Sequence, residues 1–437
     1  MKSRINIDKP ALRVARKNSQ QEDKHRPLKT PGVLEDVQHA FEGLCVQAGL
    51  QVLQELMEED RVGLCGPKGV PDEARTAVRG GHTPASVVLG GQRLPIQRPR
   101  VRDRDNGELV LPSYEWASAA DPLTAATMAA VAASVSMRRY ASVKRTVPDP
   151  FRARQDATSK SAVSRRFVDK SGQHLKRALS APLGKLDLPV VMIDGIYLAG
   201  SVILVALGID AQGHKHVLGL HEGSTESTRV VKALLAELIE RGLQADRPRL
   251  WVIDGGKALR RAITECFGTL ALVQRCQEHK RRNVLDHLPE AKQAGVGKAM
   301  RDAWDSGNAQ LARQRLARLA DALEAQHPGA ARSLREGLAE SLTVQALGIT
   351  GALYRTLRTT NPIENLNGSI ARYARNVKRW KDARMIERWV ASALEDAQGR
   401  FRRLLGFRDM LKLSAALDAH ARNIERSATP HPLRKAA

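Results

Sequence analysis

The stretch from Leu188 to Leu220 decides the fold class, and it reads LPVVMIDGIYLAGSVILVALGIDAQGHKHVLGL. Three short apolar runs stand out within it, at residues 188–193, 201–207 and 214–220. Apolar runs of this length, bounded by turn residues such as glycine and aspartate, are typical of buried β-strands. Because the connections between them are short, the stretch predicts three adjacent strands in an antiparallel meander.

Helices and strands alternate after this meander. An apolar stripe at helical spacing predicts a helix from about Ser224 to Arg241, where Gly242 ends it. A strand at 249–253, a helix at 257–267 and a strand at 270–273 follow. The order β-β-β-α-β-α-β is that of a ribonuclease H-like domain. The sequence therefore predicts an α/β fold with a ribonuclease H-like mixed sheet.

The flanking sequence predicts further parts. The first thirty residues carry nine Lys or Arg and three Asp or Glu with almost no apolar pattern, which predicts a disordered basic arm. The expected divisions are 1–30, the arm; 31–180, a mainly helical DNA-binding region with a small β-hairpin; 185–288, the catalytic core; 289–355, an all-α insertion; 356–410, the final catalytic helices; and 411–437, a C-terminal tail.

Within the N-terminal region, apolar positions from Val33 to about Glu59 recur at helical spacing. Gly90-Gly91 lies between apolar runs and predicts a tight hairpin. After a break at Pro148–Pro150, a serine-capped helix begins near Ala162 and carries Arg165 and Arg166. This helix suits a helix-turn-helix reader of DNA, or it is a packed helix with a solvated basic face.

The charge points to a polyanionic partner. The 437 residues include 70 Lys and Arg against 47 Asp and Glu, a net charge of +23. Such a balance attracts nucleic acid through counterion release, although ribosomal and membrane-surface proteins share it. Four cysteines without a Cys-x-x-Cys pair exclude a disulfide scaffold. The longest apolar stretch is too short to cross a bilayer and no apolar signal region begins the chain, so we expect a cytoplasmic protein.

Two nearly identical motifs contain candidate catalytic residues: VMIDG, with Asp194, and WVIDG, with Asp254. A single Asp-Gly is usually only a turn signal. Here the apolar run continues through Asp194, and Asp254 ends the fourth strand, where open α/β sheets place ligands. The first and fourth strands would be neighbours, so the two carboxylates would lie side by side. Paired carboxylates repel unless a divalent cation separates them, which predicts a metal centre.

Glu364 is the candidate for a third ligand. It lies just inside a helix whose start is marked by Asn361 and Pro362. An acidic residue in the first turn is also what the helix dipole favours, so a purely structural role is the alternative. The helix is expected to continue through the cations Arg372, Arg375, Lys378 and Arg379. Cations behind a metal-ligating carboxylate would place the DNA backbone over the metals.

Cys276 and His279 have the spacing of zinc ligands within QRCQEHKRRN, but no second pair closes such a site. Three interpretations stay open: a zinc site that recruits Cys266 and His287, an edge of the active site where His279 touches DNA, and a packed cysteine beside a solvated histidine. The cations expected to contact DNA are Lys257, Lys280, Arg281, Arg282, Arg372, Arg375 and Arg379.

Four phrases, taken in order, resemble one family: IDGIYLAG; the stretch from GSTES at 223–227 through RGL to Ile253-Asp-Gly; QRCQEHKRRN; and LRTTNPIENLN. Over about residues 185 to 400 the chain resembles bacterial Mutator-like insertion-sequence transposases of the DDE class. The resemblance implies a ribonuclease H-like domain interrupted before its last helix by an all-α insertion. It also implies Asp194, Asp254 and Glu364 as metal ligands and catalytic residues, with Cys276 and His279 as an accessory pair.

The resemblance implies DNA cleavage and strand transfer with two magnesium ions, or with manganese. The expected partners are double-stranded DNA, as transposon ends and target, and further copies of the chain in a homo-oligomer; no membrane partner is expected. The sequence departs from the family pattern at Gly255-Gly256-Lys257, and its N-terminal match, through PRVR at 99–102 and VSMRRY at 135–140, is loose. The alternatives are a stand-alone nuclease on the same fold and a non-catalytic or repurposed DNA-binding protein.

Overall fold

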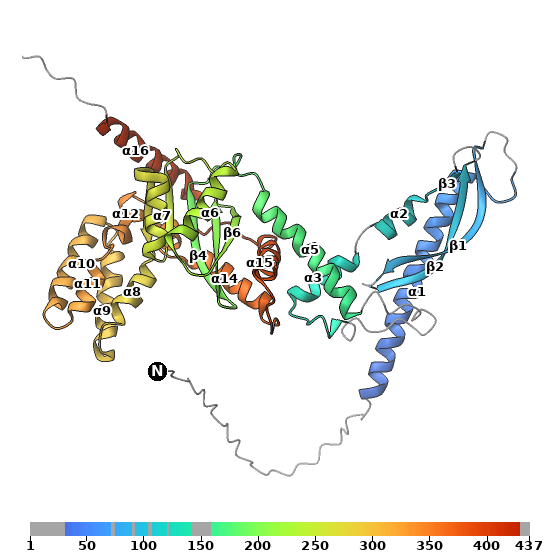
Figure 1. The fold of residues 1–437 in the computed structure, drawn as a ribbon, viewed down its shortest axis with the longest axis horizontal. Coiled ribbons are helices and arrows are strands. Elements are labelled where there is room, and N and C mark those ends of the chain that lie inside the picture. The colour runs from blue at the N-terminus through green and yellow to red at the C-terminus, as the bar shows by residue number, and fades with distance from the viewer. Residues whose placement is uncertain are drawn as a thin grey trace, which may run out of the picture.

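A mixed five-stranded sheet forms the centre of the protein. The computed structural model describes residues 31–70, 75–89, 92–103, 107–119, 122–140 and 159–428 (Figure 1). The sheet contains β4 (Val190–Leu198), β5 (Ser201–Ile209), β6 (Lys215–Gly223), β7 (Arg249–Ile253) and β8 (Ala271–Arg275), in the order β6-β5-β4-β7-β8. β4, β5 and β6 pair antiparallel, whereas β4, β7 and β8 pair parallel. The predicted meander and the predicted adjacency of the first and fourth strands are confirmed.

The hairpin between β4 and β5 is tighter than the sequence indicated. Ala199 and Gly200 both have positive φ, at 55° and 87°, and Leu198 pairs directly with Ser201. Two residues of this conformation form the turn that matches the twist of the strands it joins. As a result β4 continues to Leu198, five residues beyond the predicted end at Ile193, and Asp194 lies within the strand.

Helices cover both faces of this sheet. Alternate residues of β4 belong to two cores: Val190 and Met192 face one, while Val191 and Ile193 face the other. Helices α6 (Thr228–Glu240) and α7 (Lys257–Phe267) cover the second face. The first is covered by α5 (Lys160–Ser180), α14 (Asn361–Ala374) and α15 (Ala383–Gln398). The fold is a three-layered α/β arrangement.

An all-helical segment connects β8 to α14, as expected. It comprises α8 (Gln277–Leu285), α9 (Glu290–Trp304), α10 (Ala309–Glu324), α11 (Pro328–Arg335), α12 (Thr343–Ala346) and α13 (Gly351–Leu357). Helices α8 to α11 have a core of their own, which includes the fully buried Trp304 and Leu316, whereas α12 and α13 add Val344 and Leu353 to the core against the sheet.

Two expectations for the C-terminal part are wrong. The helix that carries Glu364 was expected to continue through Lys378 and Arg379, but α14 ends at Ala374 and the next helix, α15, begins at Ala383. The side chain of Asp382 accepts a hydrogen bond from the Met385 backbone N–H and caps the new helix, so residues 375–382 form a loop.

The second correction concerns residues 411–437. The sequence analysis treated them as a tail, but α16 spans Met410–Ala428. Met410, Leu413 and Leu417 recur at helical spacing and are buried against the sheet core, which explains why the helix forms.

The N-terminal part has its own hydrophobic core. Helix α1 (Pro31–Cys65) packs with β1 (Ala77–Leu89), β2 (Gln92–Asp103), β3 (Gly107–Leu109) and α2 (Pro112–Ala119). Leu89 pairs with Gln92, which confirms the predicted hairpin, although its strands are longer than expected. In Figure 1 this unit lies at the opposite end of the protein from α9–α11.

Helices α3 (Pro122–Ala132) and α5 lie between the two parts. Ser159 caps α5 as predicted, accepting a hydrogen bond from the Ala162 N–H at 3.3 Å. The basic arm and the break at Pro148–Pro150 fall outside the described residues, so the helix-turn-helix interpretation stays a prediction. Among the residues that are described, no helix is long and apolar enough to span a membrane.

Candidate active site

Asp194 lies on β4, and Asp254 directly follows β7, the parallel neighbour of β4. The register pairs Val190 with Leu250 and Met192 with Val252. Asp194 and Asp254 each follow the last of these pairs by two residues, and the charge of Asp254 acts on Asp194, so the two carboxylates lie at the same edge of the sheet. The two nearly identical sequence motifs therefore lie side by side in the sheet, as the sequence predicted.

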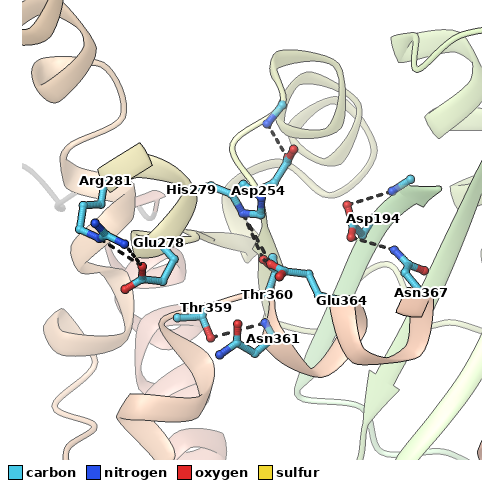
Figure 2. A network of polar contacts seen from close by, with 12 residues as sticks. Asp194, Asp254, Glu278, His279, Arg281, Thr359, Thr360, Asn361, Glu364 and Asn367 are labelled. Carbon is cyan, nitrogen blue, oxygen red and sulfur yellow. Dashed lines mark hydrogen bonds and ion pairs between the residues drawn. The ribbon is translucent and has the colours of Figure 1, made fainter. Parts of the chain in front are cut away.

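Asp194 is held by two hydrogen bonds and has an unfavourable electrostatic environment (Figure 2). Its Oδ1 accepts from the Gly195 backbone N–H at 3.0 Å, and its Oδ2 accepts from Asn367 Nδ2 at 2.8 Å. Burial, followed by the negative charges of Asp254 and Glu364, raises the pKa of this carboxyl to about 6. A group so placed is stabilised as a carboxylate when a cation binds beside it.

The loop between β7 and α7 holds Asp254. Its Oδ1 accepts from the Gly256 backbone N–H at 2.7 Å. Gly255 has a φ of 104°, a conformation that glycine adopts readily, and α7 begins two residues later at Lys257. The position just before a helix N-terminus also favours a negative charge.

Helix α14 brings Glu364 to the two aspartates (Figure 2). Thr360, the N-cap, is fully buried, and its hydroxyl donates a hydrogen bond to Glu364 Oε1. One turn beyond Glu364, the same helix carries Asn367, which binds Asp194. One helix therefore positions one carboxylate and orients a second, so the three predicted ligands belong to one site.

Cys276 and His279 lie against Glu364. Their ligand atoms and that of Glu364 are all within 4.8 Å of one another. The ring Nδ1 of His279 is 3.7 Å from Glu364 Oε1 and 3.3 Å from the Thr360 hydroxyl. Among the described residues no comparable cluster includes Cys266 or His287, so the four-ligand zinc interpretation is wrong.

The thiol and the imidazole adjust each other's protonation. The hydrogen bond with Cys276 raises the pKa of His279 against the effect of burial, and the nearby charges of Cys276, Glu364 and Asp254 act in the same direction. Burial raises the pKa of Cys276, but hydrogen bonds with His279 and Thr360 outweigh it and lower the pKa overall. A thiolate at Cys276 and an imidazolium at His279 would stabilise each other, and the ring of His279 is the member of the pair that faces Glu364.

Glu226 is a fourth carboxylate at this site, which the sequence analysis did not single out. A Cβ built on Gly256 would lie 2.9 Å from Glu226 Oε1 and 3.2 Å from Asp254 Oδ1, so both carboxyls border the same small space. Burial and the charge of Asp254 raise the pKa of Glu226. Its signal was its place in GSTES, directly before the cap Ser227 of the helix that follows the third strand.

Comparison with known proteins decides the family. The model of transposases of the Mutator family matches residues 28–403. The chain belongs to the Mutator family of transposases. The transposase of insertion sequence element ISRM5 from Rhizobium meliloti (strain 1021) is 27% identical over 326 residues, which cover 74% of this chain and 79% of that protein.

Two further relatives agree. The transposase of element IS256 in transposon Tn4001 from Staphylococcus aureus is 25% identical over 362 residues, 79% of this chain and 87% of that protein. The transposase of element IST2 from Acidithiobacillus ferrooxidans is 31% identical over 163 residues, which cover 37% of this chain and 54% of that protein. Membership of the Mutator family implies that the protein acts on DNA.

The predicted DNA-contacting cations of this Mutator-family protein have different environments. Lys257, Arg282, Arg372 and Arg375 are exposed. Arg281 pairs with Glu278 on its own helix at 2.8 Å.

Two of these cations need correction. Lys280 is 1% exposed, and its ammonium donates to the Ser333 and Glu336 carbonyls, so it joins α8 to the segment around α11 and is not available to DNA. Arg379 is exposed, but it lies in the loop after α14 rather than on the helix. The sequence predicted that Lys280 is exposed, but tertiary packing buries it. The sequence also predicted that the helix continues through Arg379, but a new helix begins after the Asp382 cap.

Proposed function

We propose that the protein is a DNA transposase that cleaves DNA ends and joins them to a target, using a ribonuclease H-like domain and divalent cations. The observation that carries this proposal is that Asp194 on β4 and Asp254 after the neighbouring parallel strand β7 share one edge of the sheet, where α14 adds Glu364. The order β6-β5-β4-β7-β8, with its parallel and antiparallel halves, supports the ribonuclease H-like assignment.

The donor set fits hard divalent cations. Asp194, Asp254 and Glu364 offer carboxylate oxygens only, which magnesium and manganese prefer. The raised pKa of Asp194 reflects a concentration of negative charge that a cation would relieve. These three residues would hold two magnesium ions, which would activate water or a DNA 3′-hydroxyl and stabilise the departing oxygen.

The chain's own residues orient these ligands. Asn367 fixes one oxygen of Asp194, the Gly256 N–H fixes one oxygen of Asp254, and the Thr360 hydroxyl fixes one of Glu364. The second oxygen of Asp194 accepts from the Gly195 N–H, whereas the second oxygens of Asp254 and Glu364 are left to face a cation or the DNA. Such outer partners are typical of metal sites, where they set ligand direction.

Exposed cations would position the DNA. Arg372 follows Glu364 on α14, and Arg375 caps the helix. The net charge of +23 supports binding of double-stranded DNA, as transposon ends and as target. Holding two ends and a target requires more than one active site, so we propose that the protein works as a homo-oligomer on DNA.

The test uses the purified protein with duplex DNA that carries the element's own terminal repeats and magnesium. We expect the wild type to nick the repeat end and to form strand-transfer products. Asp254→Asn should abolish both reactions and still bind the DNA, because it removes a ligand charge with little change in shape. Asp418→Asn, an exposed acid on α16, is the matched control and should stay active.

Other outcomes would identify the alternatives. Cleavage without any joined product would favour a stand-alone nuclease on the same fold. DNA binding without cleavage by the wild type, in magnesium and in manganese, would contradict the proposal and favour a non-catalytic DNA-binding protein.

A further inference from the structure

A groove lies at the C-terminal end of α14, away from the carboxylates. It is formed by α5, by residues 135–138 after α3, and by the loop between α14 and α15. The groove encloses about 560 Å³, within the range of ligand-binding sites. Six cations line it and no acidic residue does; they are Arg138, Lys160, Lys378, Arg379, Lys381 and Arg388.

These cations have no neutralising partner in the described part of the chain. No ion pair joins any of the six to a carboxylate, although the structure pairs many other arginines and lysines, such as Arg177 with Glu395 nearby. Five of the six are exposed and Arg388 is half-buried. Six like charges around one groove repel one another, and an anionic ligand would relieve that repulsion.

The groove is built on a packed floor. Phe167 of α5 packs on Trp389 of α15 with ring centroids 4.5 Å apart, and the Asn376 amide donates to the Ser134 carbonyl. Met137 and Val168 add apolar surface, and Val168 is 46% exposed. The aromatic rings are themselves buried, so the floor offers apolar surface more than free faces for base stacking.

The groove has a defined distance from the candidate active site. Tyr373 lines the groove and lies nine residues after Glu364 on α14. At 1.5 Å per residue, these two positions are about 14 Å apart along the helix axis, which B-form DNA covers in about four base pairs.

We propose that this groove binds the sugar–phosphate backbone of duplex DNA about four base pairs from the cleaved bond. The rim of cations complements the phosphates, and the apolar floor suits the deoxyribose rings between them. The distance from the cleaved bond rests on the proposed function, because it takes the carboxylates as the point of cleavage. The groove binds DNA whether or not cations occupy the carboxylate site.

The first experiment measures DNA affinity against salt by fluorescence anisotropy. The groove variant is Lys378→Gln, Arg379→Gln and Lys381→Gln combined. The control removes the same charge from exposed cations of the insertion: Arg313→Gln, Arg318→Gln and Arg332→Gln. Each lost phosphate contact lowers the slope of log affinity against log salt by about 0.9. We expect a slope lower by about 1 to 3 in the groove variant and an unchanged slope in the control.

An unchanged slope in a folded groove variant, or an equal fall in the control, would overturn the proposal. Sedimentation of the same variants tests another occupant, an acidic surface of a second copy. A groove variant that loses self-association but keeps the wild-type salt slope would assign the groove to a protein interface instead.

The second experiment places single uncharged methylphosphonates along the DNA. Wild-type binding should weaken most with the substitution about four base pairs from the cleaved bond, and the groove variant should lose this sensitivity. Equal sensitivity at all positions, or in both proteins, would overturn the placement. If the proposed function is wrong but the groove binds DNA, the protein will not cleave DNA, while the salt titration and the methylphosphonate scan still give the expected results.

Discussion

The two ends of α14 differ in the sign of the charged groups that lie there. They also differ in whether contacts within the protein hold those groups in place. At the first turn, Glu364 lies with Asp194 and Asp254, and hydrogen bonds from Thr360 and Asn367 fix the carboxylates. At the last turn, the groove gathers cations that have no carboxylate partners among the described residues. One end therefore concentrates negative charge and the other concentrates positive charge. Phosphates and divalent ions together would satisfy both, and the predictions below test whether the two ends act independently.

Among changes outside the three carboxylates, the largest effect is expected from Asn367→Ala. This change removes the amide that holds Asp194 Oδ2 and leaves the carboxylates in place. Loss of such an outer partner typically costs about 10- to 100-fold in activity or metal affinity. We expect that loss in the cleavage rate, with an unchanged salt slope for DNA binding. A fall in the salt slope would show that the two ends of α14 are not independent.

Glu226→Gln should have a smaller effect, because Glu226 borders the site from the side of Asp254 only. The change removes one negative charge with little change of shape. We expect the magnesium concentration needed for half-maximal cleavage to rise about tenfold, at the low end of the range for outer partners of a metal site. Glu222→Gln, two residues before the Ser224 turn, is the matched control. Identical magnesium dependence in both variants would assign Glu226 a structural role.

Asp194→Asn should stabilise the metal-free protein. The pKa of Asp194 in the folded protein, about 6, lies above the ordinary value of 3.8, so its ionisation destabilises the fold increasingly as the pH rises from 3.8 to about 6, and fully above that. Removing the charge should therefore raise the free energy of unfolding in EDTA at neutral pH by on the order of 1 kcal/mol. This gain is measured as a higher melting temperature. The buried Asn367 Oδ1 has no hydrogen-bond partner, so its amide can turn and accept from the new asparagine.

The gain should shrink as the pH falls from 6 towards 4, because wild-type Asp194 is then protonated in the folded state too. Magnesium should stabilise the wild type and not the variant, which reverses the order of the melting temperatures. A variant that is less stable in EDTA at every pH would show that the Asp194 charge is already compensated within the protein.

These residues also show what the sequence could predict. The strands and the two aspartates were predictable because a buried strand is a local apolar run, and identical phrases on neighbouring strands align by register. Glu364 was predictable from its place in the first turn of a helix whose start is marked by Asn361 and Pro362. Lys280 and Glu226 were not, because the direction of a charged side chain depends on which elements pack around it.

The loop after α14 shows the same limit. Its basic residues permit a helix by propensity, and a single cap at Asp382 decides the break. The break turns Arg379 and Lys381 towards the groove, so the feature that the sequence missed is the one on which the groove depends.

The smallest effect concerns His174, which joins α5 to the sheet-bearing part of the chain. It is buried on α5 and its Nδ1 lies 3.3 Å from the Ser392 hydroxyl of α15. Burial lowers its pKa; the charge of Glu395 opposes this effect, and Arg177 and Lys170 add to it. A histidine with a lowered folded pKa stabilises the protein above its unfolded pKa, about 6.5, and this stability is lost as the pH falls below that value.

His174→Gln keeps a polar group near Ser392 and removes the titration. We expect the melting temperature of the wild type to fall more steeply than that of the variant between pH 6.5 and pH 5, with parallel curves above pH 7. Because α5 supplies Phe167 to the floor of the groove, groove binding should weaken over the same interval. Parallel melting curves at every pH would show that α5 stays docked when His174 is protonated, and the groove would then be as rigid as the carboxylate end.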